Sequence, residues 1–185
     1  HYKFMLEGLQ HVKKELHKRG IRFLIYKISP EIGALEISNF ASLLVTDRGY
    51  LRIERKWREF VAGNVSCSVV QIESNVIVPV ESASVKEEYS AATLRSKLNK
   101  IIQNYVVPIQ EAKVKIPSSD MDFLRILKSV KCLKNEIDIS DISKTISELE
   151  IDQSILPVAS FKGGTDVAKI TLENFIKSKL PLYSS

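Results

Sequence analysis

The chain has 185 residues, of which 44% are hydrophobic and 26% are charged, a composition that fits a folded domain and excludes a disordered chain. Lysine and arginine outnumber aspartate and glutamate by 27 to 22. The resulting charge of +5 suits an anionic partner, although many ordinary enzymes carry a similar balance. Because the sequence contains neither an apolar run of 18 residues nor a signal peptide, we expect a soluble intracellular protein without membrane contact, cytoplasmic if prokaryotic.

The first predicted element is an amphipathic helix that ends at Gly20. Its apolar side chains recur at helical spacing: Met5, Leu9, Val12 and Leu16. A glycine after the last turn is typical of the left-handed residue that ends a helix. Since the chain runs from His1 directly into this helix, we expect the strand that usually opens a parallel α/β domain to be missing. The β-branched and aromatic run 21–28 then predicts a strand covered on both faces.

Helices and strands alternate through residue 72. Ser29 and Pro30 begin a short helix that runs to Ile37. Residues 42–47 predict a buried strand, and residues 66–72 predict another. The helix between them has an apolar face and ends at Gly63–Asn64; that face consists of Ile53, Trp57, Phe60 and Val61. This alternation requires parallel pairing with right-handed crossovers, so we predict a Rossmann-like, doubly wound α/β sheet with a helical C-terminal extension.

Helical patterns also mark the second half of the chain, after an extended stretch that contains Pro79. Ser84 and Glu87 have capping-box spacing and predict the start of a helix. Its apolar stripe comprises Leu94, Leu98, Ile101 and Tyr105. Residues 111–160 predict a connector with two short helical patterns, one at Phe123, Leu127 and Val130 and one at Ile142, Ile146 and Leu149. Residues 161–165 predict a turn before a last helix, whose apolar face is Ala168, Leu172, Phe175, Ile176 and Leu180.

Few residues in the sequence suggest chemistry. Asp47 lies at the carboxyl end of a predicted parallel strand, where open α/β sheets bind ligands, but a carboxylate that caps the following turn is the alternative. Trp57 has a core-facing spacing and is interpreted as a packing residue. Cys67 and Cys132 lack metal-ligand spacing, which favours reduced thiols. The histidines have no evident partner and are expected at the surface: His1, His11 and His17.

Four cations form a possible phosphate-binding stripe: Arg48, Arg52, Arg55 and Lys56. Such spacing lines one face of a helix, and clustered cations can contact the backbone of a nucleic acid. Glu54 and Glu59 dilute the charge, and a solvated helix face is the more common meaning of this pattern.

Several stretches resemble class II deoxyribodipyrimidine (CPD) DNA photolyases, of the photolyase/cryptochrome superfamily. Residues 1–9 resemble the first helix of the family's antenna domain, and residues 44–57 resemble its next strand-turn-helix unit. Residues 75–98 follow the family's stretch into its connector. Matching residues near the end resemble the entry to the flavin domain: Phe161 to Gly164, Ala168, Leu172, Phe175, Ile176, Lys179, Leu180 and Tyr183. The four stretches occur in the family's order along nearly the whole chain.

The resemblance implies a light-dependent enzyme that repairs UV-damaged DNA. In such carbon–carbon lyases a reduced FAD donates an electron to a pyrimidine dimer flipped out of the duplex, and the electron returns after the dimer splits. The resemblance makes Tyr183 a residue of the FAD pocket and Asp47 a candidate contact for a deazaflavin or folate antenna. It divides the chain into an antenna domain (1–110), a connector (111–160) and the start of a helical FAD-binding domain (161–185).

The same resemblance predicts an N-terminal fragment that is inactive alone and belongs to a longer, monomeric enzyme. Two other functions stay open from the sequence. A cryptochrome-like photoreceptor would share this architecture, and a plain α/β module could bind nucleic acid through its basic helix. The identity of the antenna chromophore is not specified by these residues.

Overall fold

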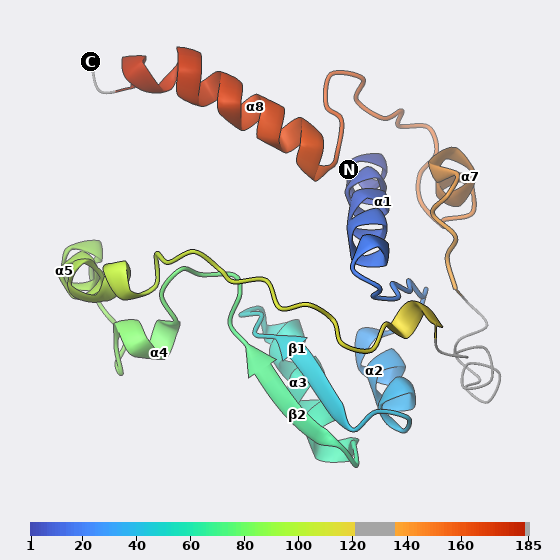
Figure 1. Cartoon of the computed structure of the whole chain (residues 1–185), viewed down its shortest axis with the longest axis horizontal. Helices are drawn as coiled ribbons and strands as arrows, with labels where there is room; N and C mark the ends of the chain where they lie inside the picture. Colours follow the sequence, from blue (N-terminus) through green and yellow to red (C-terminus); the bar gives the residue numbers. More distant parts are fainter. Residues whose placement is uncertain (121–135, 184–185) are drawn as a thin grey trace. The chain divides into compact units, whose positions relative to one another are not determined.

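The computed structural model describes residues 1–120 and 136–183 (Figure 1). Within these residues the chain divides into two compact units. The first combines residues 1–27 and 113–120 with residues 136–183, and the second comprises residues 28–112. Each unit is described by itself below. The domain boundaries expected from the sequence remain predictions.

The second unit is built on a small parallel sheet. Strand β1 (Leu43–Asp47) pairs with β2 (Ser68–Ile72) in register from Leu43 opposite Ser68 to Asp47 opposite Ile72. Helix α3 (Arg52–Asn64) connects the two strands and packs against α2 (Pro30–Ser38), as the alternation in the sequence predicts. The described residues therefore form a mixed α/β structure with a parallel strand pair.

The ends of α2 and α3 follow from local chemistry. Pro30 occupies the first turn of α2, where its missing N–H costs nothing. At the start of α3, the Glu54 carboxylate accepts a hydrogen bond of 2.9 Å from the Leu51 N–H, satisfying a donor that the helix leaves unpaired. Val61 is buried and anchors α3 in the second unit. The expectation that residues 42–47 form a buried strand is only partly met: β1 forms, but Leu43 and Val45 are each about half exposed.

Two short helices complete the second unit. Helix α4 (Val80–Ala83) precedes α5 (Ala91–Ile101), which continues as a single 3-10 turn. Ser90 caps α5 by accepting a bond from the Thr93 N–H, so the prediction that Ser84 begins this helix is wrong. The Ser84 hydroxyl instead donates to Glu88, and Lys97 bonds to both residues.

The first unit packs its N-terminal helix against segments that lie far along the chain. Helix α1 (Tyr2–Lys18) contacts α7 (Ile142–Ser147), and α8 (Thr165–Ser178) follows later in the chain. The core includes Leu6 and Ile139, which is 1% exposed. The side-chain amide of Gln10 donates a bond of 2.5 Å to the Ile139 carbonyl, 129 residues away along the chain. These contacts hold α1 against a segment distant in sequence.

Gly163 gives α1 a second attachment. Its N–H donates a bond of 2.6 Å to the Glu7 carboxylate, and a side chain at this position would collide with the Phe4 carbonyl oxygen. Next to it, His11 lies 3.4 Å from the Asp166 carboxylate and is mostly buried, so the expectation of a surface histidine without a partner is wrong for His11. The fold places His11 beside a residue that no local pattern connects to it.

The predicted strand at residues 21–28 is not observed. One isolated antiparallel bridge joins Tyr26 to Glu136, and the Arg22 N–H donates to the Ser118 hydroxyl at 2.8 Å. The backbone of this segment is thus satisfied by single, distant partners instead of a ladder of strand hydrogen bonds. The sheet of the described residues contains only β1 and β2, so the multi-stranded doubly wound arrangement expected around this strand is not observed. Gly20 does end α1, with φ of 72°, as predicted.

Some expectations lie outside the described residues. These are the helical pattern at Phe123, Leu127 and Val130, and the cysteine at 132. Among the residues that the structure covers, no helix is both long enough and apolar enough to cross a membrane.

Candidate functional site

The carboxyl end of the β1–β2 pair carries a network of polar side chains, here called the strand-end network. It consists of Asp47, Arg48, Tyr50, Glu73, Ser74 and Glu81. All six belong to the second unit. They meet because parallel strands end at the same edge of a sheet, so that the residues after β1 lie beside the residues after β2.

Asp47 is exposed at the last position of β1. Its Oδ1 accepts a hydrogen bond of 2.5 Å from the Ser74 hydroxyl, which follows the neighbouring strand. The carboxylate therefore links the ends of the two strands, and among the hydrogen bonds of the described residues it makes none to the turn that follows it. Its second oxygen remains available to a ligand that offers an N–H or O–H donor.

Glu73 is the most enclosed member of the network, with a side chain 11% exposed. The Tyr50 hydroxyl and the Val80 N–H both donate to its Oε1, and Arg48 lies 3.7 Å from its Oε2. The bond from Tyr50, followed by the Val80 N–H and the Arg48 charge, lowers the pKa of Glu73 below its ordinary value. The same bond raises the pKa of Tyr50, because it favours the protonated phenol.

Arg48 is the cation of this network and does not lie with the other cations of the basic stripe. Its guanidinium donates a bond of 2.6 Å to Glu81, and this bond raises the pKa of Arg48 and lowers that of Glu81. Arg48 is therefore not available to the possible phosphate-binding stripe, because both of its partners are carboxylates. With three carboxylates and one cation, the network is suited to a donor-rich ligand and disfavours a bound phosphate.

Helix α3 carries the remaining cations of that stripe. Arg52, Arg55 and Lys56 are exposed, whereas Trp57 is half-buried, in agreement with its interpretation as a packing residue. The Glu54 carboxylate of the same helix is occupied by the Leu51 N–H.

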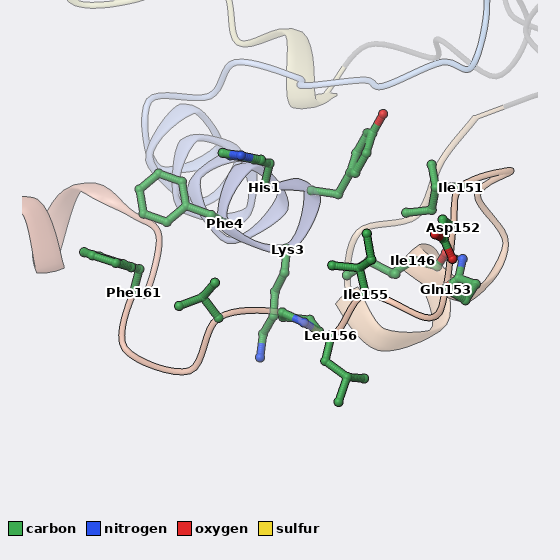
Figure 2. A pocket seen from close by; sticks show the side chains of 13 residues that line it. His1, Lys3, Phe4, Ile146, Ile151, Asp152, Gln153, Ile155, Leu156 and Phe161 are labelled. Atoms are coloured by element: carbon green, nitrogen blue, oxygen red, sulfur yellow. The ribbon is translucent and has the colours of Figure 1, made fainter.

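The first unit contains an apolar pocket of about 750 Å³ between the first turn of α1 and residues 146–161 (Figure 2). Figure 2 shows Phe4 and Phe161 at one end and Ile151 at the other, with Lys3 between them. Its lining residues are His1, Tyr2, Lys3, Phe4, Ile146, Ile151, Asp152, Gln153, Ile155, Leu156, Pro157, Val158 and Phe161. A pocket of this volume and apolar character has the features of a small-molecule site.

Two of the polar side chains that line this pocket, Asp152 and Gln153, are engaged with nearby residues. Asp152 accepts bonds from the Ser154 N–H and hydroxyl, and the bond from that hydroxyl lowers the pKa of Asp152. The Gln153 amide donates to the carbonyls of Ile146 and Leu149. These contacts give the pocket no nucleophile paired with a base. Part of the pocket lining is a run of apolar residues inside the otherwise polar predicted connector. This run alone did not predict a pocket.

Tyr183 lies after the last 3-10 turn, with its ring 80% exposed. The ring meets Phe175 of α8 edge-on, with centroids 6.3 Å apart and an angle of 71° between the planes. One exposed phenol can offer a ring face and a hydroxyl to a flavin but does not form a pocket. Neither Tyr183 nor Asp47 lines the apolar pocket described above.

Comparison with known proteins assigns the chain to a family. The family model described as DNA photolyase matches residues 1–115, well over half of the sequence. The chain belongs to the DNA photolyase family. The matched region includes the strand-end network and the α3 cations, and it ends before residues 146–161 of the apolar pocket and before Tyr183.

Individual relatives of this photolyase-family chain extend the similarity beyond residue 115. The deoxyribodipyrimidine photo-lyase of Methanothermobacter thermautotrophicus is 33% identical over 99% of this chain and 38% of its own length. The Potorous tridactylus protein of the same name is 27% identical over the full chain and 33% of its own length. The Oryza sativa relative, also so named, is 35% identical over 54% of the chain. The chain thus spans between a third and two fifths of the first two relatives.

Within residues 1–120 and 136–183, no group of three or more histidine, cysteine, aspartate or glutamate side chains could hold a metal ion. Cys67 is a half-buried free thiol next to β2.

Proposed function

We propose that this chain is the N-terminal part of a class II CPD DNA photolyase, a light-dependent carbon–carbon lyase that splits cyclobutane pyrimidine dimers. The observation that carries the proposal is the DNA photolyase match over residues 1–115, continued along 99% of the chain by an archaeal deoxyribodipyrimidine photo-lyase. The class II assignment rests on the four stretches of resemblance in the family's order. The proposed partner is UV-damaged DNA, and the proposed enzyme of the relatives' length is a monomer.

The proposed cofactor is FAD, which in its reduced form supplies the electron for dimer splitting and regains it afterwards. The repair therefore consumes neither an oxidant nor a reductant. Tyr183 supports this proposal by presenting an exposed ring and hydroxyl at the end of the α8 segment. For this role the chain is proposed to divide into an antenna domain (1–110), a connector (111–160) and the first residues of the FAD-binding domain (161–185).

The strand-end network is the proposed contact for an antenna chromophore, a deazaflavin or folate. Asp47 supports this role, since its free carboxylate oxygen can accept a hydrogen bond from a ring N–H of such a molecule. Arg48 and Glu73 would hold the edge of the sheet in place around it. Arg48 follows β1 and contacts Glu73 and Glu81, which both follow β2, and Glu73 also accepts bonds from Tyr50 and Val80.

Two proteins test the proposal: one of the relatives' length that contains these residues, and the 185-residue chain alone. Each is incubated with an oligonucleotide that carries one pyrimidine dimer, in the light and in the dark, and the remaining dimer is quantified. We expect light-dependent loss of the dimer with the longer protein and none with the chain alone. Light-induced flavin reduction without dimer loss in the longer protein would instead support a cryptochrome-like photoreceptor.

A further inference from the structure

The exposed face of α3 concentrates positively charged side chains that form no ion pair within the described residues. Arg52, Arg55 and Lys56 lie at spacings of three and four residues, which places them on one stripe of the helix. All three are exposed. The opposite side of α3 is the packed side, where Val61 is buried and Trp57 is half-buried. The three cations, here called the α3 basic face, therefore point away from the side of the helix that packs within the second unit.

None of these cations has an ion-pair partner among the described residues. Glu54 lies on the packed side and binds the Leu51 N–H, and Glu59, although one turn along the stripe, forms no ion pair in the described part of the chain. Elsewhere in the same unit, exposed or half-buried cations do find carboxylates, as Arg48 and Lys97 show. The α3 basic face is distinguished by this lack of ion-pair partners.

Helix stability does not account for the position of these charges. Arg52 begins α3, where the positive end of the helix dipole disfavours a cation, and Arg55 and Lys56 follow at the start of the next turn. Acidic residues are the ones that stabilise this end, and the first turn holds one, Glu54. A partner with closely spaced negative charges would offset the unfavourable arrangement.

We propose that the α3 basic face is a docking surface for the phosphate backbone of duplex DNA. Arg52 and Lys56 are separated by about 6 Å along the helix axis, from a rise of 1.5 Å per residue. Phosphates of one DNA strand recur about every 3.4 Å along the duplex, so long side chains at this spacing can reach two or three of them. The choice of DNA as the polyanion rests on the proposed function. The contact is independent of base sequence, of damage and of light.

The experiment measures binding of the 185-residue chain to an undamaged duplex in the dark, at several salt concentrations. Each phosphate contact contributes about 0.9 to the slope of the logarithm of affinity against the logarithm of salt. The variant Arg52→Gln/Arg55→Gln/Lys56→Gln is expected to bind more weakly, with a slope shallower by about 2.7 if all three side chains contact phosphates.

A charge-matched control uses three exposed lysines from the α8 segment, Lys169, Lys177 and Lys179, each replaced by glutamine. It lowers the net charge by the same three units, from +5 to +2. A third variant, Glu59→Gln, removes the carboxylate of the stripe and is expected to tighten binding about twofold, a gain that misfolding would not produce.

The three variants distinguish a DNA contact at the α3 basic face from a general effect of net charge. Loss of slope in the α3 variant with near-normal binding in the α8 control, together with the gain for Glu59→Gln, supports the docking surface. Equal losses in the two triple variants, an unchanged slope in the α3 variant, or no DNA binding by the unaltered chain would each overturn it. Because the duplex carries no dimer and no light is used, failure here leaves the repair proposal intact, and failure of repair leaves this surface intact.

Discussion

The two compact units differ in how far along the chain their contacts reach. In the second unit, the linked side chains are close in sequence: Lys97 and Glu88 are separated by 9 residues, and Arg48 and Glu81 by 33. In the first unit, Gln10 binds the carbonyl of Ile139 across 129 residues, and Glu7 binds Gly163 across 156. Nearby contacts can be inferred from local spacing, whereas the distant ones depend on a fold that no short motif encodes. The first unit should accordingly be the more sensitive to single changes at its distant contacts.

The largest expected effect comes from Ile139 in the first unit. Replacing this 1% exposed side chain by alanine removes buried methyl groups and leaves a cavity, at a cost of about 3 kcal/mol. The matched control is Ile155→Ala, because Ile155 is 76% exposed on the wall of the apolar pocket and should change stability by less than about 0.5 kcal/mol. The readout is hydrogen exchange of the α1 backbone amides. Equal effects from the two substitutions would contradict the assignment of Ile139 to the core of the first unit.

Gly163 gives an intermediate effect and tests the second distant contact. In Gly163→Ala the added methyl group meets the Phe4 carbonyl, so the turn must move and its bond to the Glu7 carboxylate is lost, at a cost of about 2 kcal/mol. Gly8→Ala is the control, since a methyl group there meets open space in α1 and should stabilise the helix by about 0.5–1 kcal/mol. Urea unfolding followed by circular dichroism should shift in opposite directions for the two variants, and a shift in the same direction would contradict the assigned contact.

The smallest expected effect concerns acid stability in the second unit. Hydrogen bonds from Lys97, Ser84 and Thr93 lower the pKa of Glu88 to about 2. A depressed carboxylate pKa stabilises the fold above the unfolded value of 4.5, and this stabilisation is lost as pH falls from there through about 2. We expect the urea midpoint, followed by Trp57 fluorescence, to fall over this range.

Two substitutions isolate that contribution. Glu88→Gln should flatten the pH dependence between 4.5 and 2, because the amide does not titrate. Glu87→Gln serves as the control, since Glu87 is exposed, and should leave the profile as steep as before. Identical profiles for the unaltered chain and Glu88→Gln would show that the Glu88–Lys97 contact does not govern acid unfolding.

The elements that the sequence predicts well are those whose signals are local. The apolar face and terminal Gly63–Asn64 predict the end of α3, Pro30 predicts the start of α2, and Gly20 predicts the end of α1. The β-branched runs around β1 and β2 predict both strands and their parallel pairing. In each case the side chains responsible lie within the element or next to it.

The failures have a common physical origin in contacts that compete over distance. Residues 21–28 have strand composition, but their backbone bonds go to Ser118 and residues 136–137, so no ladder forms. Ser84 has capping-box spacing, but its hydroxyl is taken by Glu88 and Lys97, which leaves Ser90 to cap α5. The composition of β1 also does not reveal that Leu43 and Val45 are about half exposed.

The candidate site was predictable only in part. The position of Asp47 at the end of a parallel strand follows from the alternation of elements, and the structure places it there. The register of the two strands places Ser74 beside Asp47. The same register brings Arg48 to Glu73 and Glu81, so that Arg48 is not part of the basic stripe. The apolar pocket combines the first turn of α1 with residues 146–161, and no local pattern connects these segments.

The contact between Gln10 and Ile139 has a consequence for synthesis on the ribosome. Helix α1 is translated before the segment it packs against, and Ile139 emerges 129 positions after Gln10. At 5–20 residues per second, its apolar face remains uncovered for on the order of ten seconds, while α3 and the strands around it can already assemble. During that interval the nascent chain exposes Leu6 and its neighbours, which a holding chaperone could bind.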